Sequence, residues 1–263
     1  MADKSSIASA SGSVPGGNNG EQKKLNNGGA LLEVPRHIAV IPDGNRRWAR
    51  KRLLPAAAGH KAGVEAFRKL MAHATDIGVK YVTFYAFSTE NWKRSREEVG
   101  ALMKLLLNNL INVDKQMGEY RNRVRFLISG DRSELSPELV EAIEETERKT
   151  AGNSDLIAVV CINYGGRDEI VHAVKKIAEK VKNGGLASED ISEQLLSSEM
   201  YEDIPDPDLI IRTSGEQRLS NFLLWQSAYS ELYFSELLWP DFDDDELDKA
   251  ISAYSARKRR YGK

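Results

Sequence analysis

The chain has 263 residues, of which 41% are hydrophobic and 29% charged, with a formal net charge of -2 at pH 7. A chain of this length buries enough apolar surface to fold without disulfides, and its one cysteine, Cys161, excludes an intramolecular disulfide. No apolar run is long enough to cross a membrane, the four histidines form no zinc-binding cluster, and the near-neutral charge is untypical of a general nucleic-acid-binding protein.

Residues 1–33 are predicted to form a disordered tail. The first thirty residues contain five Ser, six Gly and four Asn and no aromatic residue, a composition typical of disordered segments. They lack the apolar stretch of a secretory signal and are rich in Ser but not in Arg, so they match an organelle transit peptide only weakly. We expect a soluble protein of the plastid stroma or cytoplasm, with one folded domain at residues 34–263.

From Val34 onward, short β-branched runs alternate with longer segments of helical period. The predicted strands are 37–41, 81–86, 124–128, 156–163, 209–212 and 232–234. The predicted helices are 60–77, 96–120, 137–150, 167–182, 188–199 and 243–258. This alternation predicts an α/β fold, with a mainly parallel sheet and helices on both of its faces. Such sheets bind ligands beyond the carboxyl ends of their strands. The residues that directly follow each predicted strand are therefore the candidates for a functional site.

Charged side chains follow the first predicted strand. The sequence Pro42-Asp43-Gly44-Asn45-Arg46-Arg47-Trp48 places a carboxylate, a glycine and two guanidinium groups close to the strand end. The carboxylate is a candidate ligand of a divalent cation, and the backbone amides and the second arginine are candidates for binding anionic oxygens. A turn followed by a basic helix start explains the same residues, so this segment alone leaves both interpretations open.

Two further strand ends carry polar residues. Residues 87–94 combine hydroxyl, amide, indole and guanidinium groups, which alone is typical of a polar loop before a helix N-cap at Ser95. Residues 212–221 place two arginines six apart around a small-residue turn, a candidate diphosphate clamp whose alternative is a surface salt-bridge loop. Three such strand ends in one sheet together favour a site for one or two diphosphates with a metal ion.

These segments resemble the cis-prenyltransferase family, which includes undecaprenyl diphosphate synthase and its plant relatives. The resemblance extends to Gly59-His60-Lys61-Ala62-Gly63, Asn163-Tyr164-Gly165-Gly166-Arg167 and residues 221–241, and covers roughly residues 35–262. It implies a homodimer of single α/β domains, each with a six-stranded, mainly parallel sheet flanked by helices and a hydrophobic tunnel. The implied reaction is Mg²⁺-dependent condensation of isopentenyl diphosphate with an allylic diphosphate (dimethylallyl, geranyl or farnesyl), which forms a Z double bond and releases diphosphate.

The resemblance also implies roles for individual residues. The implied catalytic residues are Asp43, His60 and Asn91. The residues implied to bind the allylic diphosphate are Gly44, Asn45, Arg46, Arg47, Trp48, His60, Ser88, Trp92 and Arg94. Those implied to bind isopentenyl diphosphate are Arg212, Arg218, Ser220, Arg260 and Gly262. The implied Mg²⁺ ligands are Asp43 and Glu231.

The tunnel walls are expected from helices 60–77 and 96–120 and from strand 156–162. Most of the apolar residues of the second helix are nevertheless expected to be ordinary core: Leu102, Met103, Leu105, Leu106 and Leu110. We expect a product of short to medium length, and peripheral membrane contact if the product is long. The acidic run at 244–248 is interpreted as a helix start, because acidic residues stabilise the amino end of a helix.

Two alternatives accompany this interpretation. Ala56, Gln217 and Pro42 depart from the bacterial pattern of the family, which leaves open an irregular coupling of two dimethylallyl diphosphates. A non-catalytic partner subunit of a prenyltransferase complex is disfavoured, because such chains typically lose the aspartate of the first motif or the Arg-Thr-Ser-Gly segment, and both are intact here. Nucleic acid is not an expected partner.

Overall fold

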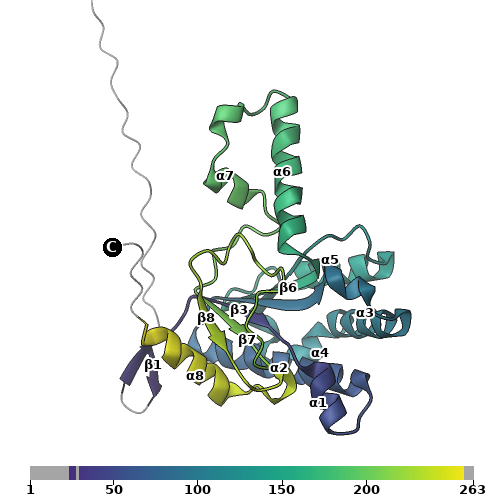
Figure 1. Ribbon diagram of the computed structural model, residues 1–263, viewed down its shortest axis with the longest axis vertical. Coiled ribbons are helices and arrows are strands. Elements are labelled where there is room, and N and C mark those ends of the chain that lie inside the picture. Colours follow the sequence, from purple (N-terminus) through teal and green to yellow (C-terminus); the bar gives the residue numbers. More distant parts are fainter. Residues whose placement is uncertain (1–23, 28–29, 258–263) are drawn as a thin grey trace, which may run out of the picture.

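A parallel sheet organises the chain in this computed structural model, which describes residues 24–27 and 30–257 (Figure 1). The strands lie in the order β5-β6-β4-β3-β7-β8, and every neighbouring pair is parallel. Their bounds are β3 (His37–Ile41), β4 (Tyr81–Ser88), β5 (Val124–Ser129), β6 (Leu156–Tyr164), β7 (Leu209–Arg212) and β8 (Glu231–Phe234). The predicted six-stranded α/β sheet is thus confirmed.

The helices largely follow the predicted ranges. They are α1 (Asn45–Lys51), α2 (Ala56–Ile77), α3 (Arg96–Ile111), α4 (Val113–Met117), α5 (Pro137–Thr150), α6 (Gly166–Lys182), α7 (Glu193–Ser198) and α8 (Asp244–Ser255), with short 3₁₀ turns at η1 (Thr89–Lys93), η2 (Gly118–Asn122), η3 (Ser188–Asp190) and η4 (Trp239–Asp241). None of the helices in the described ranges is long and apolar enough to span a membrane.

Two helical predictions were wrong in detail. The helix predicted over 96–120 is divided at Asn112, whose side-chain amide donates to the Asn108 carbonyl at 2.8 Å and so competes with the helical backbone pattern. The helix predicted over 188–199 is likewise divided, into the 3₁₀ turn η3 and the helix α7. The short helix α1 begins directly after Gly44, where the sequence offered a basic helix start as one of two interpretations.

The predicted disordered tail is described only in its last part. Residues 24–27 and 30–33 form the antiparallel strands β1 (Lys24–Asn27) and β2 (Ala30–Glu33), which differs from the prediction that disorder extends to residue 33. The Glu33 amide donates to Ser255 Oγ of α8 at 3.0 Å, a contact between chain ends that the sequence does not indicate. Residues 1–23 lie outside the described part of the chain.

Each face of the sheet carries its own apolar cluster. Ile38 and Val40 of β3 face the cluster that α2 and α8 complete, whereas Ala39 and Ile41 pack with Phe222 on the other face. The strand is therefore buried on both faces, which explains its unbroken apolar sequence. The helices α6 and α7 project from the body of the molecule as an arm (Figure 1).

His37 is buried at the amino edge of this sheet. Its Nδ1 donates to the Pro205 carbonyl at 2.6 Å, and its Nε2 accepts from Thr83 Oγ1 at 2.8 Å, an assignment that follows from the two partners. Burial lowers the pKa of His37 to about 4, because the charged imidazolium loses its hydration. The folded protein therefore holds this histidine neutral.

We expect His37 to lower the free energy of unfolding by about 3 kcal/mol as the pH drops from 6.5 to 4. Over this range the unfolded chain takes up a proton on His37 that the folded chain does not, so acid favours unfolding. Urea denaturation of the wild type and of His37→Gln across this pH range measures the effect. The variant is less stable at neutral pH but loses less stability on acidification. Parallel pH profiles for the two proteins would contradict the prediction.

Candidate active site

Asp43 lies just beyond β3, at the carboxyl edge of the sheet. Its carbonyl oxygen accepts hydrogen bonds from Thr213 Oγ1 at 2.7 Å, Ser214 Oγ at 2.8 Å and the Trp239 amide at 3.0 Å. The next residue has to be Gly44, because its φ is +111° and an added Cβ would lie 2.3 Å from Ser214 Oγ. The backbone at Asp43 is thereby held by segments far away in the sequence.

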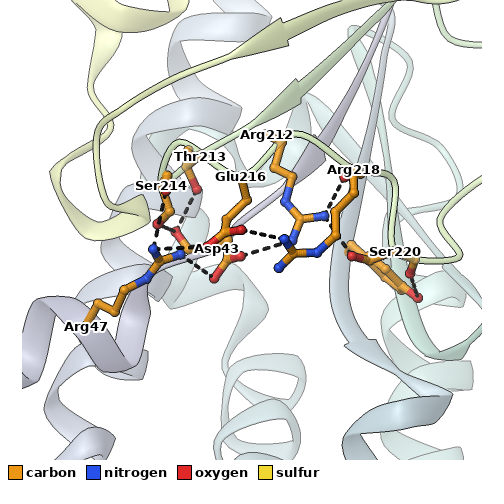
Figure 2. Close-up of polar contacts among 9 residues, drawn as sticks. Asp43, Arg47, Arg212, Thr213, Ser214, Glu216, Arg218 and Ser220 are labelled. Carbon is orange, nitrogen blue, oxygen red and sulfur yellow. Dashed lines mark hydrogen bonds and ion pairs between the residues drawn. The ribbon is translucent and has the colours of Figure 1, made fainter.

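Two arginines flank the Asp43 carboxylate (Figure 2). Arg212 Nη2 lies 3.1 Å from Asp43 Oδ2, and Arg47 Nη2 lies 3.3 Å from Asp43 Oδ1. Arg212 ends β7 with a side chain only 5% exposed, and its Nη1 also donates to Ser220 Oγ at 2.7 Å and to the Arg218 carbonyl. Because a guanidinium stays protonated even when buried, Arg212 is a fixed positive charge beside Asp43.

The segment after Arg212 has an unusual backbone. Ser214, Ser220, Asn221 and Leu223 all have positive φ, a region that side chains other than glycine rarely adopt. Neighbouring elements hold this backbone: the Asn221 carbonyl accepts from the Gly166 amide at 2.7 Å, and Asn221 Nδ2 donates to Glu90 Oε1 at 2.9 Å. The positions of Arg212 and Ser220 are therefore set before any ligand binds.

Glu216 joins the cations of this segment to α1. Its Oε1 lies 3.2 Å from Arg47 Nη1, and its Oε2 accepts from Arg218 Nη1 (Figure 2). The hydrogen bond from Arg218 lowers the pKa of Glu216, so the carboxylate is ionised at neutral pH. Glu216 is not among the predicted site residues, although its place in the sequence between Arg212 and Arg218 indicates proximity to the site. A diphosphate bound to these arginines would compete with Glu216 for them.

A second polar cluster surrounds His60 on α2. Glu98 Oε1 accepts from Arg94 Nη1 at 2.9 Å, and Glu98 Oε2 lies 3.7 Å from Arg46 Nη1. His60 Nε2 is buried without a hydrogen-bond partner among the described residues, 4.0 Å from Glu98 Oε1. Burial is the main cause that lowers the pKa of His60, and the positive charge of the nearby Arg94 lowers it further. The ring is therefore neutral at pH 7 and can exchange a hydrogen bond with a ligand.

Close packing of α1 on α2 brings these clusters together. An added Cβ at Gly59 of α2 would lie 2.0 Å from the carbonyl oxygen of Asn45, the first residue of α1. The glycine in the Gly59-His60 motif thus allows α1, and with it Arg46 and Arg47, to lie against α2.

Two cavities, each of about 670 Å³, adjoin at Asp43. One extends over the sheet between α2 and α3, and apolar side chains such as Phe67, Leu106, Phe126 and Ile162 line much of it. The other opens beside α1 and is lined by Arg46, Arg47, Arg50, Arg94 and His60, with Leu53 and Leu54 on its wall. An apolar compartment therefore continues into a cationic one.

The apolar cavity lies where the tunnel was predicted, and it corrects one expectation. Leu102, Leu105, Leu106 and Leu110 line the cavity, and three of them, Leu102, Leu106 and Leu110, also pack against the core. Met103 packs on the core without lining the cavity. No residue of α3 is fully buried, because its apolar side faces this open space. Helical periodicity identifies an apolar face but not whether protein or a cavity lies against it.

Most of the predicted site residues line these cavities: Asp43, Gly44, Asn45, Arg46, Arg47, His60, Ser88, Asn91, Arg94, Arg212 and Ser220. Arg218 and the two tryptophans do not. Trp48 Nε1 donates to Asp241 Oδ1 at 2.6 Å, and Trp92 Nε1 donates to Asn163 Oδ1 at 2.7 Å. Both indoles therefore make structural hydrogen bonds between segments that are distant in the sequence. Arg260 and Gly262 lie outside the described residues.

The two predicted Mg²⁺ ligands do not meet within one chain. Glu231 begins β8 opposite Leu209, at the amino edge of the sheet, and its Oε2 accepts from Arg257 Nη1 at 2.6 Å. Asp43 follows Ile41, which pairs with Arg212 at the carboxyl edge. The strand register thus separates the two carboxylates, and no cluster of three His, Cys, Asp or Glu occurs among the described residues.

Asp43 can serve as the one protein ligand of a Mg²⁺ ion whose other ligands are water and phosphate oxygens. Its side chain is 31% exposed at the junction of the cavities. Protein-bound Mg²⁺ commonly takes one or two carboxylates and completes its shell with water and substrate phosphates. The donor set at Asp43 therefore fits an ion that arrives with a diphosphate.

Comparison with known proteins places this geometry in a family. The undecaprenyl diphosphate synthase family model matches residues 41–262. An isoprenyl transferase of Fusobacterium nucleatum is 50% identical over 229 residues, which cover 87% of this chain and 96% of the relative. A ditrans,polycis-undecaprenyl-diphosphate synthase of Pseudomonas syringae pv. tomato, named as (2E,6E)-farnesyl-diphosphate specific, is 50% identical over 231 residues, 88% of this chain and 91% of the relative.

A solved structure has the same fold. The lavandulyl diphosphate synthase of Lavandula x intermedia, in complex with dimethylallyl diphosphate, superposes with a TM-score of 0.84 at 37% identity, covering 88% of this chain and 99% of that one. The sheet, the cavities and these relatives agree: the chain belongs to the undecaprenyl diphosphate synthase family of cis-prenyltransferases, enzymes that transfer prenyl groups.

Proposed function

We propose that this protein is a Z-prenyl diphosphate synthase, which condenses isopentenyl diphosphate with an allylic diphosphate and releases diphosphate. The observation that carries the proposal is the junction of the apolar and the cationic cavity at Asp43. An allylic diphosphate has a hydrocarbon chain and an anionic head, and the two compartments match these two chemistries. The family's prenyl transferases, to which this chain belongs, support the same reaction class.

The allylic diphosphate head belongs in the cationic cavity. The backbone amides of Gly44 and Asn45 and the side chains of Arg46, Arg47 and Arg94 supply donors there. His60, neutral and with an unpartnered Nε2 among the described residues, supplies one further hydrogen-bonding group. Trp48 acts indirectly, since its hydrogen bond to Asp241 fixes the helix that carries Arg46 and Arg47.

Isopentenyl diphosphate belongs on the other side of Asp43. Arg212, Ser220 and Arg218 surround that position, and the strained backbone of their segment holds them ready. Arg260 and Gly262 complete this set in the proposal, on the strength of the family motif alone.

The proposed reaction breaks the bond between the allylic carbon and its diphosphate oxygen. That carbon then bonds to the terminal alkene carbon of isopentenyl diphosphate, and a proton leaves the isopentenyl unit. The arginines stabilise the departing diphosphate, while the apolar walls exclude the water that would trap an allylic cation. Ser88 and Asn91 line the apolar cavity, where the Ser88 amide donates to Asn91 Oδ1 at 3.1 Å. The released diphosphate accepts this proton, and we assign Asn91 to positioning at that step.

Mg²⁺ is the proposed cofactor, with Asp43 as its protein ligand. The ion, when bound, neutralises charge on the departing diphosphate. Between the two arginines, the Asp43 side chain remains accessible, and its carboxylate oxygens are ligands of the kind that Mg²⁺ prefers.

We also propose a homodimer assembled through the α6–α7 arm. Val171 and Val174, one helical turn apart on α6, are 49% and 52% exposed on the projecting arm (Figure 1). Apolar side chains so placed gain free energy when a second copy covers them.

Irregular coupling of two dimethylallyl diphosphates is the second candidate activity. One observation favours it, namely the TM-score of 0.84 to the lavandulyl diphosphate synthase solved with dimethylallyl diphosphate. The 50% identity to the isoprenyl transferases favours the regular reaction.

A single assay separates the candidates. We expect the full chain with Mg²⁺ and labelled isopentenyl diphosphate to form Z-prenyl products from dimethylallyl, geranyl or farnesyl diphosphate. Chromatography of the dephosphorylated products gives their length, for which we propose the short to medium range. Product from dimethylallyl diphosphate alone would establish irregular coupling. No product from any of the substrates would overturn the proposed function.

Asp43→Ala is expected to lower kcat at least about a hundredfold, because it removes the proposed metal ligand and leaves Arg212 without its carboxylate. Asp245→Ala, at an exposed position in the first turn of α8, is the matched control and is expected to keep wild-type activity. Circular dichroism checks that both variants fold. More than a few per cent of activity in a folded Asp43→Ala protein would refute the assigned role.

Leu110→Phe is expected to shorten the products by one or more five-carbon units. Leu110 lines the cavity in the last turn of α3, about 12 Å along the helix from Leu102, so a larger ring there blocks the deep end. Met103→Phe adds the same ring on α3 at a position that does not line the cavity, and is expected to leave the product distribution unchanged. Equal product distributions for both variants and the wild type would contradict this tunnel assignment.

A further inference from the structure

The elbow between α1 and α2, residues 50–55, exposes apolar side chains that the fold does not use. Residues 50–57 are all exposed, and Leu53 and Leu54 are 95% and 44% exposed. Leu53 has a φ of 55°, a left-handed conformation in which a leucine is strained and a glycine is not. Since its side chain gains no packing in return, folding alone does not account for a leucine at this position.

The surroundings of the two leucines are strongly cationic. Between Asp43 and Glu65 the sequence has six basic residues and no acidic one. Arg50 and Lys51 directly precede the leucines, and within the described residues no ion pair links either of them to a carboxylate. The elbow therefore combines apolar side chains with uncompensated positive charge.

The elbow is rigidly attached to the fold. Arg52 Nη2 lies 3.1 Å from Asp241 Oδ1, and its guanidinium carbon lies 4.1 Å from the centre of the Trp48 ring. The Leu54 amide donates to the Ala49 carbonyl at 2.9 Å. The two leucines are thus presented in a preformed conformation, which reduces the entropic cost of binding.

We propose that the elbow docks onto the surface of an anionic phospholipid bilayer. Leu53 and Leu54 enter the boundary between headgroups and acyl chains, while Arg50 and Lys51 contact lipid phosphates. The charge favours this partner over an uncharged apolar one, because the elbow offers cations without counter-charges. In Figure 1, α1 lies at the end of the molecule away from the α6–α7 arm, so docking leaves that arm uncovered.

Docking here has a consequence for the active site. Leu53 and Leu54 are on the wall of the cationic cavity that opens beside Asp43. A bilayer at the elbow therefore lies next to the mouth of that cavity, where an amphipathic prenyl diphosphate enters or leaves. This consequence rests on the proposed function, whereas the docking itself does not.

Co-sedimentation of the full chain with vesicles tests the proposal. We expect binding to phosphatidylcholine vesicles with about 30% phosphatidylserine, and much weaker binding to phosphatidylcholine alone or at high salt. Leu53→Gly combined with Leu54→Ser is expected to lower the partition coefficient about a hundredfold, tenfold for each leucine. Glycine also suits the backbone at Leu53, so this variant keeps its fold, and thermal denaturation verifies that.

Matched variants control for exposed apolar area and for charge. Ile111→Ser combined with Ile191→Ser removes two aliphatic side chains that are 57% and 47% exposed elsewhere on the protein, and this variant is expected to bind vesicles as the wild type does.

Arg50→Gln combined with Lys51→Gln tests the charge of the elbow and is expected to weaken binding about fivefold for each charge, on anionic vesicles only. Lys175→Gln combined with Lys182→Gln, on α6, is the charge control and is expected to have no effect.

The proposal is overturned if the wild type does not bind anionic vesicles, if the leucine variant binds as tightly as the wild type, or if the control variants lose as much binding. The vesicles contain no prenyl diphosphate, so this result is independent of the prenyl-transfer assay. A protein that transfers prenyl groups but does not bind vesicles would refute docking and leave the proposed function intact.

Discussion

The contact between Arg212 and Asp43 is the interaction on which the rest of the site depends. It joins the ends of two adjacent parallel strands, because Arg212 pairs with Ile41 in the register and Asp43 follows two residues later. A buried guanidinium without a carboxylate is strongly unfavourable, so the contact fixes both side chains. The same arginine holds Ser220 and the Arg218 carbonyl, and in this way one buried charge positions both sides of the site.

The site separates two chemical environments that prenyl transfer needs side by side. Cationic groups are needed next to the departing diphosphate, and apolar walls are needed around the allylic cation. The sheet provides this separation through its connections. After β3 the chain enters α1 and α2, which bring arginines and one wall of the apolar cavity. After β7 it enters the strained segment that carries Ser220. Asp43 lies where the two compartments meet.

Strands such as β3 and β6 were predictable because burial on both faces of the sheet gives them a nearly continuous apolar sequence. The carboxyl ends of parallel strands meet at one edge, so Asp43 and Arg212 were predictable as neighbours. For the short helix α1 the sequence indicated only a basic start, and the hydrogen bond that attaches this helix to the fold joins Trp48 to Asp241, 193 residues away. The role of Leu106 was not predictable, since an apolar helix face has the same sequence pattern over a cavity as over a core.

By itself, the sequence determined which residue types follow the strands. Acidic, basic and small residues in this order at the carboxyl ends of parallel strands indicate binding of diphosphates with a metal ion. Only the tertiary structure decided which of them share a site. It separated Glu231 from Asp43, turned the indoles of Trp48 and Trp92 to structural hydrogen bonds, and made Glu216 the link between two arginines. The physical reason is that strand register and the packing of distant segments place each side chain, and neither is encoded within any single motif.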